Sequence, residues 1–141
     1  MQSVVLKKSA CTYHVKVLSD YSNIKMEILG EWFTDDVSDR IKPWINWFND
    51  QDKLTENTES NATWFEKEWL PNGACNVTFG SIVDLIQDKA PIYIPDPART
   101  LIMPRENVIE LLETWKELLK TCPNQIMITE EGGIYKMFAV Q

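Results

Sequence analysis

The C-terminal part of this chain carries the pattern that most constrains its fold. Between residues 104 and 121, apolar side chains recur at intervals of three and four, namely Val108, Leu111, Leu112, Trp115, Leu118 and Leu119. Glutamates and lysines fill the opposite positions, so the segment predicts an amphipathic helix with one apolar face. Pro104 suits the first position of a helix, and Pro123 suits the region just beyond its end. We expect this helix to pack on one face of a sheet.

A β-hairpin is expected directly after this helix. Residues 125–129 and 134–140 flank the sequence Glu130-Glu131-Gly132-Gly133. Glycines can supply the backbone angles of a tight turn between two antiparallel strands. The chain therefore predicts a helix that leads into a terminal hairpin.

Two further strands are expected near the N-terminus. Apolar and polar residues alternate over residues 11–18, and Ile24, Met26 and Ile28 alternate with other residues over 24–31. We therefore predict a single α+β domain over residues 1–141. Its mostly antiparallel sheet would hold these strands and the terminal hairpin, with the amphipathic helix of about residues 104–121 packed on one face.

Shorter elements are expected in the first half of the middle region. Thr34 can cap a helix whose first turn would hold Asp35 and Asp36, where the helix dipole favours carboxylates. Pro43 must either kink this helix or divide it, with a second helix beginning at about Pro43. The polar residues 49–61 are expected to form a surface loop.

A second hairpin is expected further along the chain. Its strands would cover residues 62–70, where the alternation is ambiguous but the aromatics favour a strand, and residues 74–79, joined by the turn Pro71-Asn72-Gly73. We also expect a short helix that begins at Gly80 and Ser81, and a short strand at residues 101–103. Prolines between these two elements argue against a regular central strand there.

Composition bounds the class of protein. The chain has 141 residues, of which 44% are hydrophobic and 25% are charged, as is typical of a soluble globular domain. No apolar run approaches the roughly 20 residues that span a bilayer, and no secretory signal is evident, so we expect a cytoplasmic protein that does not act at a membrane. Cys11, Cys75 and Cys122 form no CxxC pair, and we expect reduced, metal-free thiols.

This chain lacks the residue patterns on which most classes of enzyme depend. His14 is the only histidine, and strand alternation predicts that it faces solvent. No phosphate-binding glycine motif or HExxH motif occurs, and we expect no cofactor and no metal site. An enzyme remains an alternative, with carboxylates in a cleft lined by tryptophans, for which the candidates are Trp44, Trp47, Trp64 and Trp69.

Residues 31–60 combine acidic and aromatic side chains. This segment holds eight carboxylates and three basic residues, and it supplies most of the formal net charge of −7. Acid beside large aromatics suits the capture of a basic protein and would repel the phosphates of a nucleic acid. Most of these aromatics can instead belong to the core, with the acids simply solvated. The candidate partner-binding residues are Asp35, Asp36, Asp39, Asp50 and Asp52, with Glu130 and Glu131 as a second patch.

The segment LIMPRENVIELLETWKELLKTCPNQIMITEEGGIYKMFAV resembles the ending of small bacterial immunity proteins from polymorphic-toxin and contact-dependent growth inhibition systems. In many of those proteins, a strand and a proline-led helix of the ENxIxLLExWxxLL kind run into an acidic hairpin. The resemblance implies that the protein binds and neutralises a cognate toxin, frequently a basic nuclease, as a monomer or dimer. It identifies no binding residue, and a non-catalytic adaptor subunit remains a further alternative.

Overall fold

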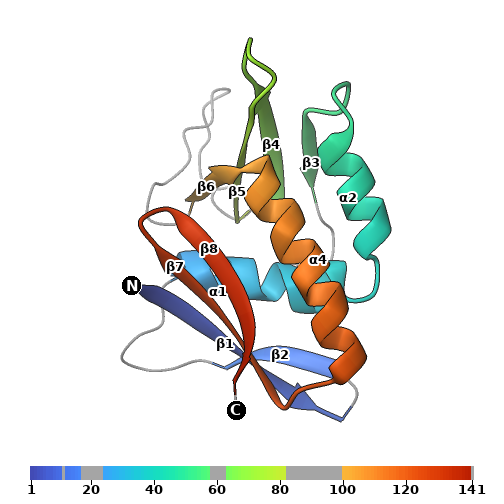
Figure 1. Cartoon of the computed structure of the whole chain (residues 1–141), viewed down its shortest axis with the longest axis vertical. Coiled ribbons are helices and arrows are strands. Elements are labelled where there is room, and N and C mark those ends of the chain that lie inside the picture. The colour runs from blue at the N-terminus through green and yellow to red at the C-terminus, as the bar shows by residue number, and fades with distance from the viewer. Residues whose placement is uncertain (11, 17–23, 58–62, 82–99, 141) are drawn as a thin grey trace, which may run out of the picture.

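The computed structural model of this chain describes residues 1–10, 12–16, 24–57, 63–81 and 100–140, and it has an α+β architecture (Figure 1). Two antiparallel four-stranded sheets lie at either end of the molecule, and helices lie between and beside them. The expected α+β class, the C-terminal helix packed on a sheet and the terminal hairpin are confirmed. The described strands form two sheets, and three of the four strands expected to share a sheet, those at 11–18, 125–129 and 134–140, lie together in the first of them.

The first sheet joins the two ends of the chain. Its strands are β1 (Gln2–Ser9), β2 (Thr12–Lys16), β7 (Gln125–Glu131) and β8 (Ile134–Val140), in the order β2-β1-β7-β8. In the register of β1 with β7, Leu6 lies opposite Ile126 and Val4 lies opposite Ile128. All four side chains are buried. Pairing of distant segments therefore creates one apolar face that the rest of the molecule covers.

The second sheet is built from the middle of the chain. Its strands are β3 (Thr55–Asn57), β4 (Thr63–Trp69), β5 (Cys75–Ser81) and β6 (Thr100–Pro104), in the order β3-β4-β5-β6. The predicted hairpin of β4 and β5 and the strand at 101–103 are confirmed. Gly73 adopts a φ of 88° in the turn, where its amide donates to the Leu70 carbonyl at 3.0 Å.

Residues 24–31 form a helix, so the strand expected there is wrong. They make up α1 (Ile24–Glu31), which continues into the π-helix η1 (Trp32–Val37). A helix buried on most sides has no polar face to reveal its period, because its apolar residues need not follow a single stripe. Met26, Ile28 and Leu29 are all buried. Gly30 adds to this close packing, since a Cβ there would lie 3.0 Å from side-chain atoms of Leu6 and Val15.

Thr34 lies inside η1 and caps no helix start. Its hydroxyl donates to the Glu31 carbonyl at 3.2 Å. Asp35 and Asp36 therefore belong to the last part of a helical segment, and the expectation that they occupy a first turn is wrong. A separate helix, α2 (Ile41–Asn49), follows and holds Pro43 in its first turn. The structure therefore has two separate helical segments here and no single kinked helix, which is the second of the two alternatives predicted for Pro43.

Two predictions for the middle of the chain, one of a loop and one of a helix, differ from the structure. Residues 49–61 contain the short strand β3, so they are not wholly a loop. Gly80 and Ser81 belong to the end of β5, so they are not themselves helical. The remainder of the helix expected there lies outside the described residues, as does Cys11.

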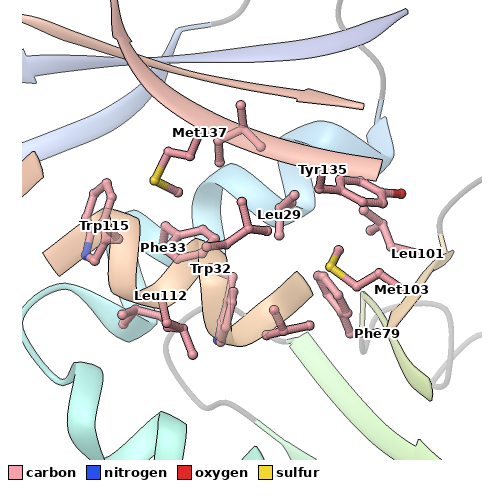
Figure 2. Packing of buried hydrophobic residues seen from close by; sticks show 14 of the residues in the cluster. Leu29, Trp32, Phe33, Phe79, Leu101, Met103, Leu112, Trp115, Tyr135 and Met137 are labelled. Atoms are coloured by element: carbon pink, nitrogen blue, oxygen red, sulfur yellow. The ribbon is translucent and has the colours of Figure 1, made fainter. Parts of the chain in front are cut away.

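Helix α4 (Arg105–Thr121) is the central packing element. It contacts β8 of the first sheet, β5 and β6 of the second, and α2. Val108, Leu111, Leu112 and Trp115 are buried as predicted, whereas Leu119 is only partly buried. Figure 2 shows side chains from α1, η1, α4 and both sheets converging on one core.

Asn107 joins the start of α4 to the edge of the first sheet. Its amide nitrogen donates to the Tyr135 carbonyl at 2.9 Å, and its amide oxygen accepts from the Tyr135 N–H at 3.0 Å. Among the strands that the structure describes, β8 lies at the edge of its sheet. The Asn107 side chain therefore bonds the two backbone groups of Tyr135 that an added strand would need, which hinders edge-to-edge pairing at this position.

Replacing Trp115 should test the central packing. We expect Trp115→Ala to lower the free energy of unfolding by about 3 to 5 kcal/mol, because it removes a large core side chain. Trp115→Phe should cost about 1 to 3 kcal/mol, since the ring is largely kept while the carbonyl of Ser38 loses its indole donor at 2.7 Å. Urea denaturation measures both, with Glu113→Ala on the exposed face as the control. Equal losses in Trp115→Ala and Glu113→Ala would contradict this packing.

Replacing Asn107 should test whether its side chain hinders edge-to-edge pairing. We expect Asn107→Leu, which keeps the side-chain size, to cost about 1 to 3 kcal/mol because both backbone groups of Tyr135 lose their partner. Light scattering of the folded protein should also increase, because an open edge strand favours association. Asn107→Asp retains an acceptor for the Tyr135 N–H and should lose less. An unchanged free energy of unfolding in Asn107→Leu would show that the pairing contributes nothing.

Candidate functional site

The first group of predicted acids surrounds the turn between η1 and α2. Asp35 and Asp39 are exposed, whereas Asp36 is partly buried and one of its carboxylate oxygens is shielded from solvent. The turn is sharp, with Ser38 at a φ of 44°. Its Ser38 carbonyl accepts the Trp115 indole N–H, so the turn is held against α4. These acids therefore project from a fixed backbone.

The pKa of the neighbouring Glu31 carboxyl is affected by the negative charges around it. Burial raises the pKa of Glu31, and the charges of Asp35 and Glu27 raise it further. The acids of α1 and η1 consequently lie close enough to interact electrostatically. Their negative charges therefore add here, while the exposed cations Arg40 and Lys42 follow directly after Asp39.

Asp50 and Asp52 lie at the other end of α2. Nine helical residues separate them from the first group, which corresponds to about 13 Å at 1.5 Å per residue. Asp50 accepts the backbone N–H of Asp52 at 2.9 Å, so part of its carboxylate stabilises the local turn. Asp52 is exposed.

Glu130 and Glu131 lie at the tip of the β7–β8 hairpin. Glu131 is exposed, whereas Glu130 is partly buried and accepts the Gly133 N–H at 2.8 Å. Burial, with the charge of Glu130, raises the pKa of Tyr135 to about 12. In Figure 1, α2 and this hairpin lie on either side of α4. The structure therefore does not bring the seven predicted acids into one patch.

Two sets of exposed acids were not among the predicted site residues. One runs along the outer face of α4 at intervals of four, three and four, and consists of Glu106, Glu110, Glu113 and Glu117. The helical periodicity that revealed the core could also have revealed this acidic stripe, which lies opposite the buried face. The other set is Glu66 and Glu68, which strand alternation places on the outer face of β4.

The aromatics of residues 31–60 mainly build the core. Trp32, Phe33, Trp47 and Phe48 are buried, and Trp44 is partly buried. The Trp32 ring lies 4.8 to 5.9 Å, between centroids, from a set of five rings, which are Phe33, Trp44, Phe48, Phe65 and Phe79. The exposed aromatic edges expected to assist partner binding are therefore confined to Trp44 within this segment.

Lys67 is a buried cation on the inner face of β4, with only 3% of its surface exposed. Its ammonium donates to the Asp50 carbonyl at 2.6 Å and to the Trp47 carbonyl, and it lies 4.0 Å from the centroid of the Trp47 ring. These carbonyls end α2, where the helix dipole favours positive charge. Lys67 therefore fastens the end of α2 to the second sheet.

Burial lowers the pKa of the Lys67 ammonium. Cys75 and Asp50 oppose this shift, whereas the charges of Arg105 and Lys53 add to it. The Cys75 thiol is itself buried, and burial raises its pKa. A protonated thiol is a poor nucleophile, and the ammonium is engaged by two carbonyls, so this cluster is suited to structure.

A groove opens beside Lys67, along the edge of β4. It encloses about 420 Å³, and its wall residues are Gln51, Leu54, Glu66, Lys67, Glu68 and Trp69. Behind Trp69, the Arg105 guanidinium lies 5.3 Å from the ring centroid and donates to Asn49 and, at 3.1 Å, to Glu106. We call the hollow formed by these six wall residues the β4 groove. Of the four tryptophans expected to line a cleft, Trp69 lines it, whereas Trp47 and Trp64 are buried.

Comparisons with known proteins add no assignment. No family model matches the chain, and no similar curated protein or solved structure was found. Within the described ranges, no group of three histidine, cysteine or acidic side chains is placed to hold a metal ion. No helix in the described part of the chain is long and apolar enough to cross a membrane. Any function must therefore be argued from the surface itself.

Replacing Lys67 should test its structural role. We expect Lys67→Met, which keeps most of the side-chain volume, to lower the free energy of unfolding by about 2 to 4 kcal/mol. Two buried carbonyls lose a charged donor, and only part of that loss is offset by the charge no longer being buried. Urea denaturation measures the effect, and Lys53→Met, at an exposed neighbour, is the control.

The same variant should change the pH dependence of stability. The folded-state pKa of Lys67 lies below the ordinary value of 10.5, so the unfolded chain binds more protons just below that pH. The contribution of Lys67 should therefore become more favourable as pH rises towards 10.5, and this rise should be absent in Lys67→Met. A Lys67→Met variant at least as stable as the wild type at neutral pH would contradict the fastening role.

Proposed function

We propose that this protein is an immunity protein that binds and neutralises a cognate, basic bacterial toxin domain. The observation that carries the proposal is the distribution of charge. Exposed carboxylates stand on η1, α4, β4 and the terminal hairpin, while the aromatic side chains that accompany them in sequence are mostly buried. The resemblance of the C-terminal segment to immunity proteins supports the same function.

The acids around the η1–α2 turn are the first candidates for the contact. Asp35 and Asp39 are exposed, and the Trp115–Ser38 hydrogen bond holds their turn beside α4. A basic partner would be steered towards these acids from a distance, because neighbouring charges of like sign reinforce each other's potential.

A rigid scaffold supports such a role. The turn that carries Asp39 is tied to α4, and α4 is packed against both sheets. Little backbone ordering would then be required on binding, which lowers the entropic cost of association. The partner is expected to be a protein and not a nucleic acid, because these carboxylates would repel phosphates.

Co-expression with the product of the neighbouring gene tests the function directly. If that gene encodes a toxic domain, this protein should restore growth and co-purify with it. A neighbour that is not toxic, or whose toxicity persists despite co-expression, would overturn the proposed function. An acidic partner would overturn its electrostatic basis.

Charge removal tests which acids steer the partner. We expect the triple variant Asp35→Asn, Asp36→Asn, Asp39→Asn to slow association by about tenfold at low salt, with little change in dissociation, because steering acts on encounter. Reversal of the same three residues to lysine should weaken binding further. Stopped-flow or surface-based kinetics at several salt concentrations would measure this.

The matched control adds the same net charge elsewhere. The triple variant Pro71→Lys, Ile102→Lys, Phe138→Lys changes exposed positions on the β4–β5 turn, β6 and β8. It should reduce association much less than the aspartate variant. Equal effects would show that only net charge matters, and insensitivity to both salt and charge would contradict steering.

A further inference from the structure

The β4 groove exists because β3 is shorter than β4. Strand β3 pairs with residues 64–66 of β4, and the last backbone contact between the two segments joins the Lys67 N–H to the Leu54 carbonyl at 2.8 Å. Before Leu54, residues 51–52 form a turn that follows the end of α2, and they are in no strand paired with β4. The edge of β4 beyond Lys67 is therefore left beside an open hollow.

The walls of the groove combine negative charge with apolar surface. Side chains of both faces of β4 line it, because a hollow at a strand edge is reached from either side. Glu66 and Glu68 are exposed and project from the outer face. Leu54, with 48% of its surface exposed, and the partly buried Trp69 supply the apolar wall.

The spacing of Glu66 and Glu68 matches the spacing of side chains on an extended peptide segment. Residues two apart on a strand project from the same face about 6.5 to 7 Å apart. Two lysine or arginine side chains at alternate positions of an extended segment have the same separation. Such a segment could pair both of its cations with Glu66 and Glu68 and place an intervening apolar side chain against Leu54 and Trp69.

The floor of the groove is held in place before anything binds. The Lys67 ammonium fastens the end of α2 to β4, and the Lys67 N–H holds Leu54. The Arg105 guanidinium lies against the Trp69 ring, which fixes the orientation of the apolar wall. The Lys67 ammonium is buried and donates to two carbonyls, whereas Glu66 and Glu68 are exposed, so the charges that an occupant can contact directly are those of the two glutamates.

We propose that the β4 groove binds an extended, basic loop of a partner protein through Glu66 and Glu68, with Leu54 and Trp69 as the apolar contact. This inference rests on the proposed function and extends it, because it names a second contact distinct from the acids of η1. A pocket of about 420 Å³ falls in the range that also accommodates small ligands, so the test separates the two kinds of occupant.

A peptide titration followed by NMR tests the groove without the natural partner. The probe is the synthetic peptide acetyl-Arg-Leu-Arg-Leu-amide, and acetyl-Glu-Leu-Glu-Leu-amide is its control. We expect saturable shifts of the backbone amides of Leu54, Glu66, Glu68 and Trp69 with the basic peptide only. Affinity should fall at least fivefold in Glu66→Gln, Glu68→Gln and be unchanged in the matched variant Glu110→Gln, Glu113→Gln on α4.

Three results would overturn the proposal. Shifts spread evenly over all exposed acids, or equally weakened by the α4 variant, would show general charge attraction only. Saturation by free arginine amide at the same concentration as by the peptide would indicate a small cationic ligand. Absence of any shift in the groove would remove the site.

The same variants separate this inference from the proposed function. If co-expression of the wild type and of Glu66→Gln, Glu68→Gln protects cells equally and the groove residues do not shift, the groove is wrong while the immunity function stands. If the peptide binds in the groove but the neighbouring gene product is not toxic, the groove stands and the immunity function is wrong.

Discussion

The apolar face of α4 is the contact on which the remaining structure depends. Two sheets that share no strand are held together because this helix packs on both of them. Trp115 is central to that contact, since its ring meets Tyr13 of the first sheet and Phe33 of η1 while its indole N–H bonds the Ser38 carbonyl. One side chain thus combines apolar packing with satisfaction of a buried donor.

The mixture of acids and aromatics in residues 31–60 follows from the same packing. A helical segment that buries one face must expose the other, so residues adjacent in sequence are separated in space. Trp32 and Phe33 enter the core, while Asp35 remains in solvent on the same π-helix. A buried cation from outside this segment, Lys67 of β4, lies at the end of α2, where the helix dipole favours positive charge.

Local periodicity predicted the elements in which one face is buried and the other is solvated. Helix α4 and the β7–β8 hairpin are of this kind, and both were predicted correctly. Helix α1 is buried on most sides, so its spacing of Ile24, Met26 and Ile28 matched a strand as well as a helix. Exposure of Asp35, Asp39, Asp52 and Glu131 could be predicted from their charge, whereas their separation into distinct surfaces could not, because it depends on where α2 and the hairpin lie.

The sequence alone determined the α+β class, the terminal helix and hairpin, and the excess of negative charge, because each depends on composition or on neighbours within one or two turns of chain. Only the tertiary structure decided the division into two sheets, the burial of Lys67 and the β4 groove. The pairing of β1 with β7 joins residues more than one hundred positions apart, and the groove arises where β3 ends short of β4. Such features depend on long-range contacts, whose partners no local pattern specifies.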